Sequence, residues 1–248
     1  MSNPVECTLY GETLWISPYV FSAFVALREK GIDFATAEVS LVEMAHTRPG
    51  YAEPTLTARV PALEHHGFWL AESSAIAEYL EDVFPAPRHA RLFPADARDR
   101  ARARMLMAWF RSDLGALREE RPTTTMFYER ATEPLSRAGS DAAAKLIRVA
   151  EKLVVAADKP LFGAWCLADS ELAFMLHRLI LNRDPLPASL RSYAEREWRR
   201  PSACAFLDHA RPTALPIEYW LIPSHEPTSP FVRAAREKLR GTPSGPPV

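Results

Sequence analysis

A serine and a proline at the start of an apolar helical pattern are the first residues that could do chemistry. Ser17 and Pro18 come directly before the stretch "YVFSAFVALREKG". A serine at the N-cap accepts a hydrogen bond from a first-turn amide, and proline suits the first helical position because no amide hydrogen is needed there. A helix N-terminus also favours an anion, because it carries partial positive charge. Ser17 is therefore either a helix cap alone or a group that also holds a negatively charged atom.

A glutamate and a serine begin a second helical pattern, "ESSAIAEYLE", at residues 72–81. Ser73 and the free amides of the first turn can form an anion-binding site. Helix capping by Ser73 is the structural alternative, and one serine can fill both roles. Upstream, Val60-Pro61 opens a strand-like stretch, where a proline is most simply a strand-initiating residue.

The cysteines and histidines show no spacing typical of a redox pair or a metal centre. Cys7, Cys166 and Cys204 are widely separated and include no CxxC pair. The neighbouring His65 and His66 lie in a predicted turn, with no further ligand at metal-binding spacing. We therefore predict no metal site and a reducing, cytoplasmic setting.

Composition and charge are those of an ordinary globular protein. The chain has 248 residues, of which 48% are hydrophobic and 25% charged, and its formal net charge is −1. Nothing in this balance indicates a nucleic-acid surface or a membrane-attracted face. No apolar run approaches the length of a membrane span, and the N-terminus lacks the layout of a signal peptide. We expect neither nucleic acid nor membrane among the partners.

Short strands and helices alternate in the first third of the chain. Residues 5–10 and 32–39 have strand character and flank the helix that follows Ser17. Residues 60–72 predict two short strands joined at a turn, and a helix follows over 73–84. The predicted order is therefore βαβ followed by ββα.

After Pro94 the pattern becomes helical. The stretch 169–181 is apolar nearly all round and predicts a buried central helix, in which His177 is a core histidine. The predicted helices span 96–114, 140–157, 169–181 and 190–210, with one more expected near 232–239. The predicted domain limits are 1–86 for an α/β domain, 87–95 for a linker, 96–211 for an all-helical domain and 212–248 for a Pro-rich extension.

This layout resembles that of the cytosolic glutathione S-transferases over roughly residues 5–210. The motifs that carry the resemblance are "SPY" at 17–19, Val60-Pro61 and "ESSAIAEYLE". The chain is similar to the branch, with bacterial members, that keeps a serine at the catalytic position. The resemblance implies a thioredoxin-like N-terminal domain and a helical bundle after it. One departure is Cys166, which stands where the family caps its buried helix with Ser or Thr, although Asp169 keeps the acidic position. A thiol is a poor cap.

The resemblance implies a site for glutathione as co-substrate. Ser17 would be the catalytic residue that holds the thiolate, with Tyr19 or Tyr10 as alternatives. The glutathione-binding residues would be Arg59 for the glycyl carboxylate, Val60 and Pro61 for the cysteinyl backbone, Glu72 for the γ-glutamyl amine and Ser73 for its carboxylate. These residues do not include a metal ligand.

A second site for a hydrophobic electrophile is expected between the two domains, from Trp15, Tyr19, Trp109, Ser112 and Phe127, each of which has a core or surface role as its alternative. The implied function is glutathione transfer to hydrophobic electrophiles, with glutathione-dependent peroxide reduction as an additional activity. The alternatives are a non-catalytic binding protein and a glutathione-dependent isomerase or ether-cleaving enzyme. The resemblance also implies a homodimer.

Overall fold

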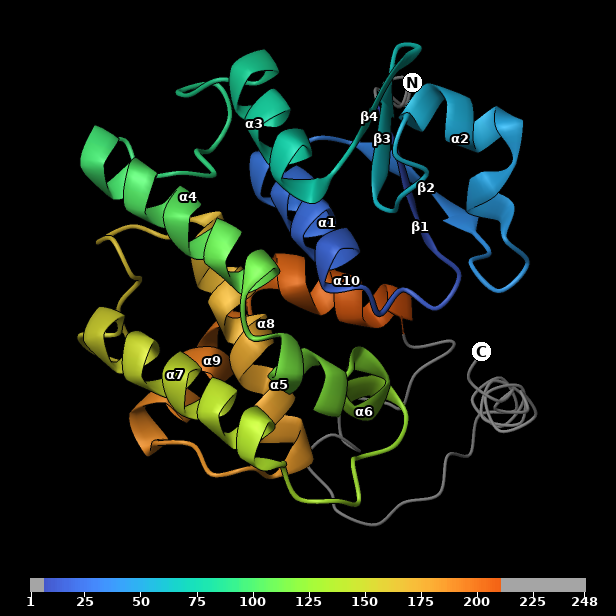
Figure 1. The fold of residues 1–248 in the computed structure, drawn as a ribbon. Helices are drawn as coiled ribbons and strands as arrows, with labels where there is room; N and C mark the ends of the chain where they lie inside the picture. The colour runs from blue at the N-terminus through green and yellow to red at the C-terminus, as the bar shows by residue number, and fades with distance from the viewer. Residues whose placement is uncertain (1–6, 211–248) are drawn as a thin grey trace.

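A four-stranded sheet with helices on both faces forms the N-terminal part of the computed structural model, which describes residues 7–210 (Figure 1). The strand order is β2-β1-β3-β4, with β1 parallel to β2 and the other neighbours antiparallel. The elements are β1 (Cys7–Glu12), α1 (Pro18–Lys30), β2 (Phe34–Val39), η1 (Ala45–Thr47), α2 (Pro49–Thr55), β3 (Ala62–His65), β4 (Phe68–Ala71) and α3 (Ser73–Val83). The predicted βαβ-ββα order and the thioredoxin-like fold are confirmed.

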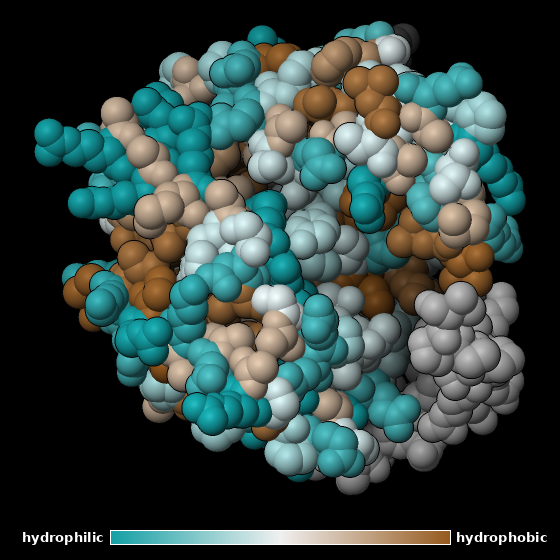
Figure 2. Space-filling model, viewed as in Figure 1, coloured by the Kyte–Doolittle hydropathy of each residue, from teal (hydrophilic) through white to brown (hydrophobic). Residues whose placement is uncertain are grey.

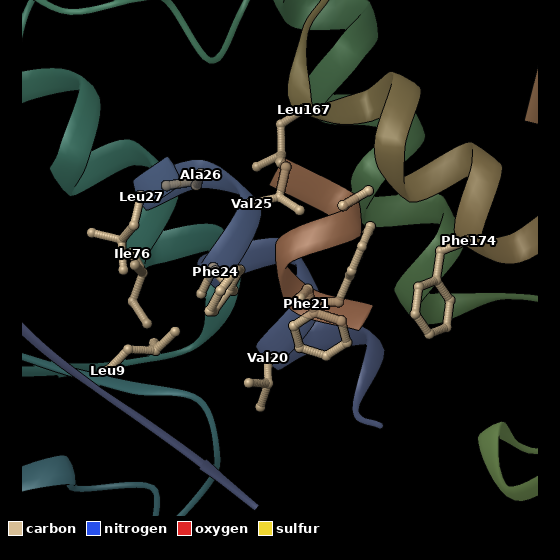
Figure 3. Packing of buried hydrophobic residues seen from close by; sticks show 14 of the residues in the cluster. Leu9, Val20, Phe21, Phe24, Val25, Ala26, Leu27, Ile76, Leu167 and Phe174 are labelled. Carbon is tan, nitrogen blue, oxygen red and sulfur yellow. The ribbon is translucent and has the colours of Figure 1, made fainter. Parts of the chain in front are cut away.

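Helix α1 is buried on nearly all sides because it lies between the sheet and the helical part of the chain. Figure 3 shows Leu27 facing Ile76 of α3 and Leu9 of β1, while Phe21 lies towards Phe174 of α8. The ring centroids of Phe21 and Phe174 are 5.0 Å apart. One apolar helix therefore joins the two halves of the hydrophobic core, and it also fixes the position of its own N-terminus.

The opposite face of the sheet carries α2 and a small aromatic cluster. The ring of Tyr10 packs against Trp69 at 4.7 Å and Tyr51 at 5.9 Å between centroids. Because successive strand residues point to opposite faces, Tyr10 points away from α1 while Leu9 points towards it.

Seven helices make up the described C-terminal part. They are α4 (Ala97–Ser112), α5 (Gly115–Glu120), α6 (Thr123–Phe127), α7 (Arg137–Leu153), α8 (Leu167–Asn182), α9 (Ala188–Trp198) and α10 (Pro201–Ala210). Helix α8 is buried along almost its whole length, as its apolar pattern predicts. The prediction of one helix over 190–210 is wrong, because the chain breaks after Trp198 and Pro201 starts α10 at a position that needs no amide hydrogen. The expected extension 212–248, with its short helix, lies outside the described residues.

The start of α8 is stabilised by an acidic side chain. Asp169 Oδ2 accepts a hydrogen bond from the backbone N–H of Cys166 at 2.9 Å. Its Oδ1 accepts from the Leu161 N–H and from the Tyr193 hydroxyl, both at 2.8 Å. Burial and the Asp169 carboxylate raise the pKa of the Cys166 thiol. Asp169 thus compensates for the poor cap.

The prediction that His177 is a core histidine is confirmed. His177 is buried, its Nδ1 lies 2.8 Å from the Ala173 carbonyl oxygen and its ring stacks on Trp198 at 4.0 Å. Burial lowers the pKa of this imidazole to about 4, so it is a neutral core histidine.

Within residues 7–210, no helix combines the length and the apolar character that crossing a membrane requires.

Candidate active site

A groove of about 540 Å³ lies where the N-terminal part meets α4, and it gathers most of the predicted site residues. Figure 2 shows that this face of the molecule is hollowed between its two parts, with hydrophilic and hydrophobic residues around the hollow. The residues that line the groove are Ser17, Tyr19, Leu41, His46, Ala58, Arg59, Val60, Pro61, Glu72, Ser73 and Arg111.

Ser17 caps α1 and lines the groove at the same time. Its Oγ accepts hydrogen bonds from the backbone N–H of Tyr19 at 3.2 Å and of Val20 at 3.3 Å. Pro18 occupies the first helical position. The capping interpretation is therefore confirmed, and the hydroxyl hydrogen stays free to donate to a group in the groove, because both cap bonds use the oxygen as acceptor.

A buried glutamate that the sequence analysis missed holds the backbone just before Ser17. Glu12 ends β1, and its Oε1 accepts hydrogen bonds from the N–H groups of Ser17, at 2.7 Å, and Ile16. Burial raises the pKa of Glu12 to about 7, although these backbone hydrogen bonds favour the carboxylate. A glutamate at the end of a core strand, five residues before Ser17, was the available signal.

The Val60-Pro61 peptide bond is cis and forms one wall of the groove. Pro61 is buried, and β3 begins only at Ala62. The peptide groups of Val60 therefore lie beyond the paired part of the strand, beside the groove. Arg59, next to them, is exposed, and its carbonyl accepts a hydrogen bond from the Tyr51 hydroxyl at 2.8 Å.

Glu72 and Ser73 form the wall that faces α4. Glu72 is exposed and has a φ of 71°, in the left-handed region that a non-glycine residue seldom adopts. Such backbone strain costs about 1–3 kcal/mol and is concentrated at binding sites. Glu72, not Ser73, is the N-cap of α3, so the capping alternative for Ser73 is wrong. Ser73 is the first helical residue, with its side chain buried at the groove.

Arg111 on α4 is the second residue that the sequence analysis missed. Its Nη2 donates to the Ser73 hydroxyl at 3.0 Å, and its two Nη atoms lie 2.5 and 2.6 Å from the carboxylate of Glu171 on α8. The Ser22 hydroxyl on α1 donates to the same carboxylate at 2.6 Å. One polar network therefore connects four helices behind the groove.

The structure corrects the expected second-substrate residues. Trp15 and Phe127 are only 2% and 1% exposed and belong to the core, so neither lines the groove. Trp109 is half-buried against the C-terminal helices, with its Nε1 donating to Asp113 at 2.7 Å. Ser112 is exposed and does not line the groove. Of the five, Tyr19 alone lies there.

The position of Trp15 follows from its backbone. Its φ of 51° places the side chain beneath α1, where its ring centroid lies 6.4 Å from those of Phe24 and Phe206. Gly11 allows this packing, because a Cβ there would lie 3.1 Å from the Trp15 ring. Likewise, Tyr10 belongs to the aromatic cluster on the far face of the sheet and is absent from the groove lining.

The histidine pair takes part in local contacts near the β3–β4 turn. His65 Nδ1 lies 2.7 Å from the Tyr79 hydroxyl oxygen, and its ring packs on His66 at 4.5 Å. In the part of the chain that the structure describes, no three His, Cys, Asp or Glu side chains are grouped to hold a metal ion.

Two family models match this arrangement of domains. The glutathione S-transferase N-terminal domain matches residues 16–83, and the glutathione S-transferase C-terminal domain matches residues 96–211. A crystal structure of a glutathione transferase homolog from Burkholderia GL BGR1, with bound glutathione, is 41% identical; the match covers 83% of this chain and 98% of that one, with a TM-score of 0.70. The chain belongs to the glutathione S-transferase family. A Trametes versicolor glutathione transferase Omega 3C, 21% identical with a TM-score of 0.64, covers 82% of this chain and 89% of that one and shares the fold.

Curated relatives match shorter stretches of the chain. A maleylacetoacetate isomerase from Pseudomonas aeruginosa is 34% identical over 108 residues, which is 42% of this chain and 50% of that protein. The protein LigF from Sphingobium is 37% identical over 83 residues, which is 34% of this chain and 32% of that protein. The chain thus spans about a third to a half of the length of these curated relatives.

Proposed function

We propose that the chain binds glutathione in the groove and activates its sulfur for reaction with an electrophile. The observation that carries the proposal is that one groove joins the N-termini of two helices, at Ser17 and Ser73, to the backbone of Val60, which lies outside the paired part of β3. A tripeptide with a thiol and two carboxylates needs these three kinds of partner. The 41% identical Burkholderia structure, which contains glutathione, supports the same ligand.

Each part of glutathione has a partner in this arrangement. The γ-glutamyl carboxylate would bind Ser73 and the first-turn amides of α3, where the helix dipole and the nearby Arg111 favour negative charge. The Glu72 carboxylate would bind the γ-glutamyl amine. The Val60 peptide groups would pair with the cysteinyl backbone as a short addition to the sheet, and Arg59 would reach the glycyl carboxylate.

Ser17 would hold the sulfur as a thiolate at the start of α1. A thiol of pKa about 8.5 is about 3% ionised at pH 7, and a decrease of about two units would raise the ionised fraction by roughly 25-fold. The less basic thiolate is about 8-fold less nucleophilic, so the net gain is roughly threefold. Activation of the sulfur is therefore a small part of the acceleration, and positioning of the electrophile beside it must contribute more.

Glutathione-dependent isomerisation is the second candidate reaction, because the curated relatives include maleylacetoacetate and maleylpyruvate isomerases. The two reactions differ in their glutathione balance. Transfer consumes one glutathione per turnover, whereas isomerisation returns it. Following free thiol during turnover of chloronitrobenzenes, hydroperoxides and unsaturated acids therefore separates transfer, peroxide reduction and isomerisation.

Calorimetric titration with glutathione tests the binding site directly. We expect Ser73→Ala and Glu72→Ala each to weaken glutathione binding roughly 30-fold, because each removes one partner of a charge-assisted hydrogen bond. Ser74→Ala is the matched control, since Ser74 is exposed and lies outside the groove. If the unsubstituted protein does not bind glutathione, or if both variants bind it as tightly, the proposal is wrong.

The same proposal includes a homodimer, as the family resemblance implies. Light scattering at micromolar concentration is expected to give twice the chain mass of 27.8 kDa. A mass of one chain at that concentration would contradict the dimer without affecting the glutathione site.

A further inference from the structure

A smaller cavity adjoins the groove on the side of the helical part. Its volume is about 30 Å³, and it shares Tyr19 and Arg111 with the groove. Its other charged lining residues are Arg118 of α5 and Arg178 and Glu171 of α8, and Phe174 contributes to an apolar wall. We call it the arginine cavity. Since Tyr19 is two residues after Ser17, this cavity lies next to the place proposed for the sulfur.

Two of the three arginines in the arginine cavity have no carboxylate partner among the described residues. The charge of Arg111 is balanced by Glu171. Arg118 donates to the main-chain carbonyls of Phe110, at 3.0 Å, and of Arg111, at 2.6 Å. Arg178 donates to the Arg121 carbonyl at 2.6 Å. Within residues 7–210, neither Arg118 nor Arg178 forms an ion pair with a carboxylate.

Arg178 is the more unusual of the two because it is buried. It is 3% exposed, and its Nε is a buried donor without a hydrogen-bond partner among the described residues. A buried charge without a counter-ion is costly, and so is a buried donor left unsatisfied. Burial, together with the nearby charge of Arg118, lowers the pKa of Arg178 to about 10. An anion in the cavity would supply the missing counter-charge.

We propose that the arginine cavity binds a carboxylate of the second substrate, so that the electrophile is an anionic, partly apolar molecule. This inference rests on the proposed function, because it places the carboxylate beside the glutathione sulfur. A planar carboxylate matches the fork of a guanidinium group. A cavity needs about 10–15 Å³ of such volume to hold one water molecule, so this cavity accepts a group of a few atoms, such as a carboxylate, but excludes an aromatic ring. The rest of the electrophile would lie in the groove against Tyr19.

A pair of electrophiles with the same skeleton tests the charge requirement. We would compare 4-chloro-3-nitrobenzoate with its methyl ester, and divide each enzymatic kcat/KM by the uncatalysed rate with glutathione. The protein is expected to favour the benzoate. Arg118→Gln should lower the benzoate-to-ester ratio about tenfold, because it removes one charged hydrogen-bond donor. Arg102→Gln, on the exposed surface of α4, is the matched control and should leave the ratio unchanged.

Direct binding of an unreactive anion separates this inference from the proposed function. Calorimetric titration with 3-nitrobenzoate, on the protein alone and with glutathione present, should show binding that Arg118→Gln weakens about tenfold and that glutathione does not displace. Arg178→Lys keeps the charge but loses the planar fork, and it should also weaken binding. Equal affinity in Arg118→Gln, or competitive displacement by glutathione, would overturn the inference. Binding of 3-nitrobenzoate without any binding of glutathione would instead overturn the proposed function and keep the anion site.

Discussion

Arg111 on α4 donates a hydrogen bond to the hydroxyl of Ser73, 3.0 Å away at the start of α3. The contact crosses from the helical part of the chain to the thioredoxin-like part. Glu171 fixes the other side of the guanidinium group, and Ser22 of α1 donates to Glu171. The wall of the groove that faces α4 is thus held by a charged pair whose members come from the helical part.

Removing the negative charge of the Arg111–Glu171 pair should lower both the stability of the fold and the affinity of the groove for glutathione. We expect Glu171→Gln to lower the free energy of unfolding by about 2–3 kcal/mol, because the partly buried Arg111 loses its counter-ion. Urea unfolding measures this change, and glutathione affinity should fall with it. The control is Glu78→Gln, whose partner Arg104 is well exposed, and which should cost less than about 1 kcal/mol. Equal effects of the two substitutions would contradict the role given to the network.

The buried Glu12 should make stability depend on pH near neutrality. The residue is 7% exposed, and burial raises its pKa from 4.5 to about 7 in the folded chain. A raised pKa means that the folded state binds the proton more tightly than the unfolded state. The contribution is therefore complete below pH 4.5 and is lost as the pH rises through 7, with a total of about 3 kcal/mol.

Substitution by the neutral isostere isolates that contribution. Glu12→Gln keeps an acceptor for the N–H of Ser17 but does not titrate, so the stability difference between wild type and variant should shift in favour of the variant from pH 5 to pH 8. Urea unfolding at several pH values measures this difference. Glu43→Gln, at an exposed position, should show no such trend. A flat difference for Glu12→Gln would mean that the carboxyl titrates normally.

The assignment of Trp15 to the core and of Tyr19 to the groove predicts stability losses of very different size on truncation. Trp15→Ala should lower the free energy of unfolding by about 3–5 kcal/mol, because it leaves a large cavity beneath α1. Tyr19→Ala should cost about 1 kcal/mol or less, since the side chain is 37% exposed. Thermal unfolding of both variants measures the contrast. A small loss of unfolding free energy for Trp15→Ala would contradict its place in the core and favour a place in the groove.

The features that could be predicted from the sequence are those that depend on a local pattern of residues. Ser17 and Gly31 mark the two ends of α1, and the structure has Ser17 as N-cap and Gly31 in the left-handed conformation as C-cap. Alternation in the strands and the apolar helix 169–181 were likewise sufficient for the βαβ-ββα order and for the central position of α8, whereas the thioredoxin-like fold was expected from the family resemblance. These features depend on residues close together in the chain.

The missed features depend on contacts between distant residues or on single backbone angles. Arg111 contacts Ser73 from another domain, and no spacing in the sequence indicates that pairing. Trp15 follows the turn after β1 and has a positive φ, which places its aromatic side chain in the core where a groove residue was expected. Pro201 is a signal for the break between α9 and α10. The apolar pattern continues on both sides of it, however, and favoured the prediction of a single helix.

The serine at the start of α1 is the central element of the proposed chemistry. If Ser17 only caps the helix, Ser17→Ala should cost about 1 kcal/mol of stability and activity should follow the folded fraction. If it holds the sulfur, kcat/KM should fall about 10-fold to 100-fold, because one donor to a negative charge is lost while the helix terminus remains. Glutathione affinity should change little, since the other contacts lie at Val60, Glu72 and Ser73.

The most direct measurement is the pKa of the glutathione thiol in the complex, followed by thiolate absorbance against pH for the wild type and for Ser17→Ala. We predict that the bound thiol titrates below the ordinary value of about 8.5 in the wild type and that its pKa rises in the variant. An unchanged thiol pKa together with normal turnover in Ser17→Ala would contradict this account and leave Ser17 as a helix cap.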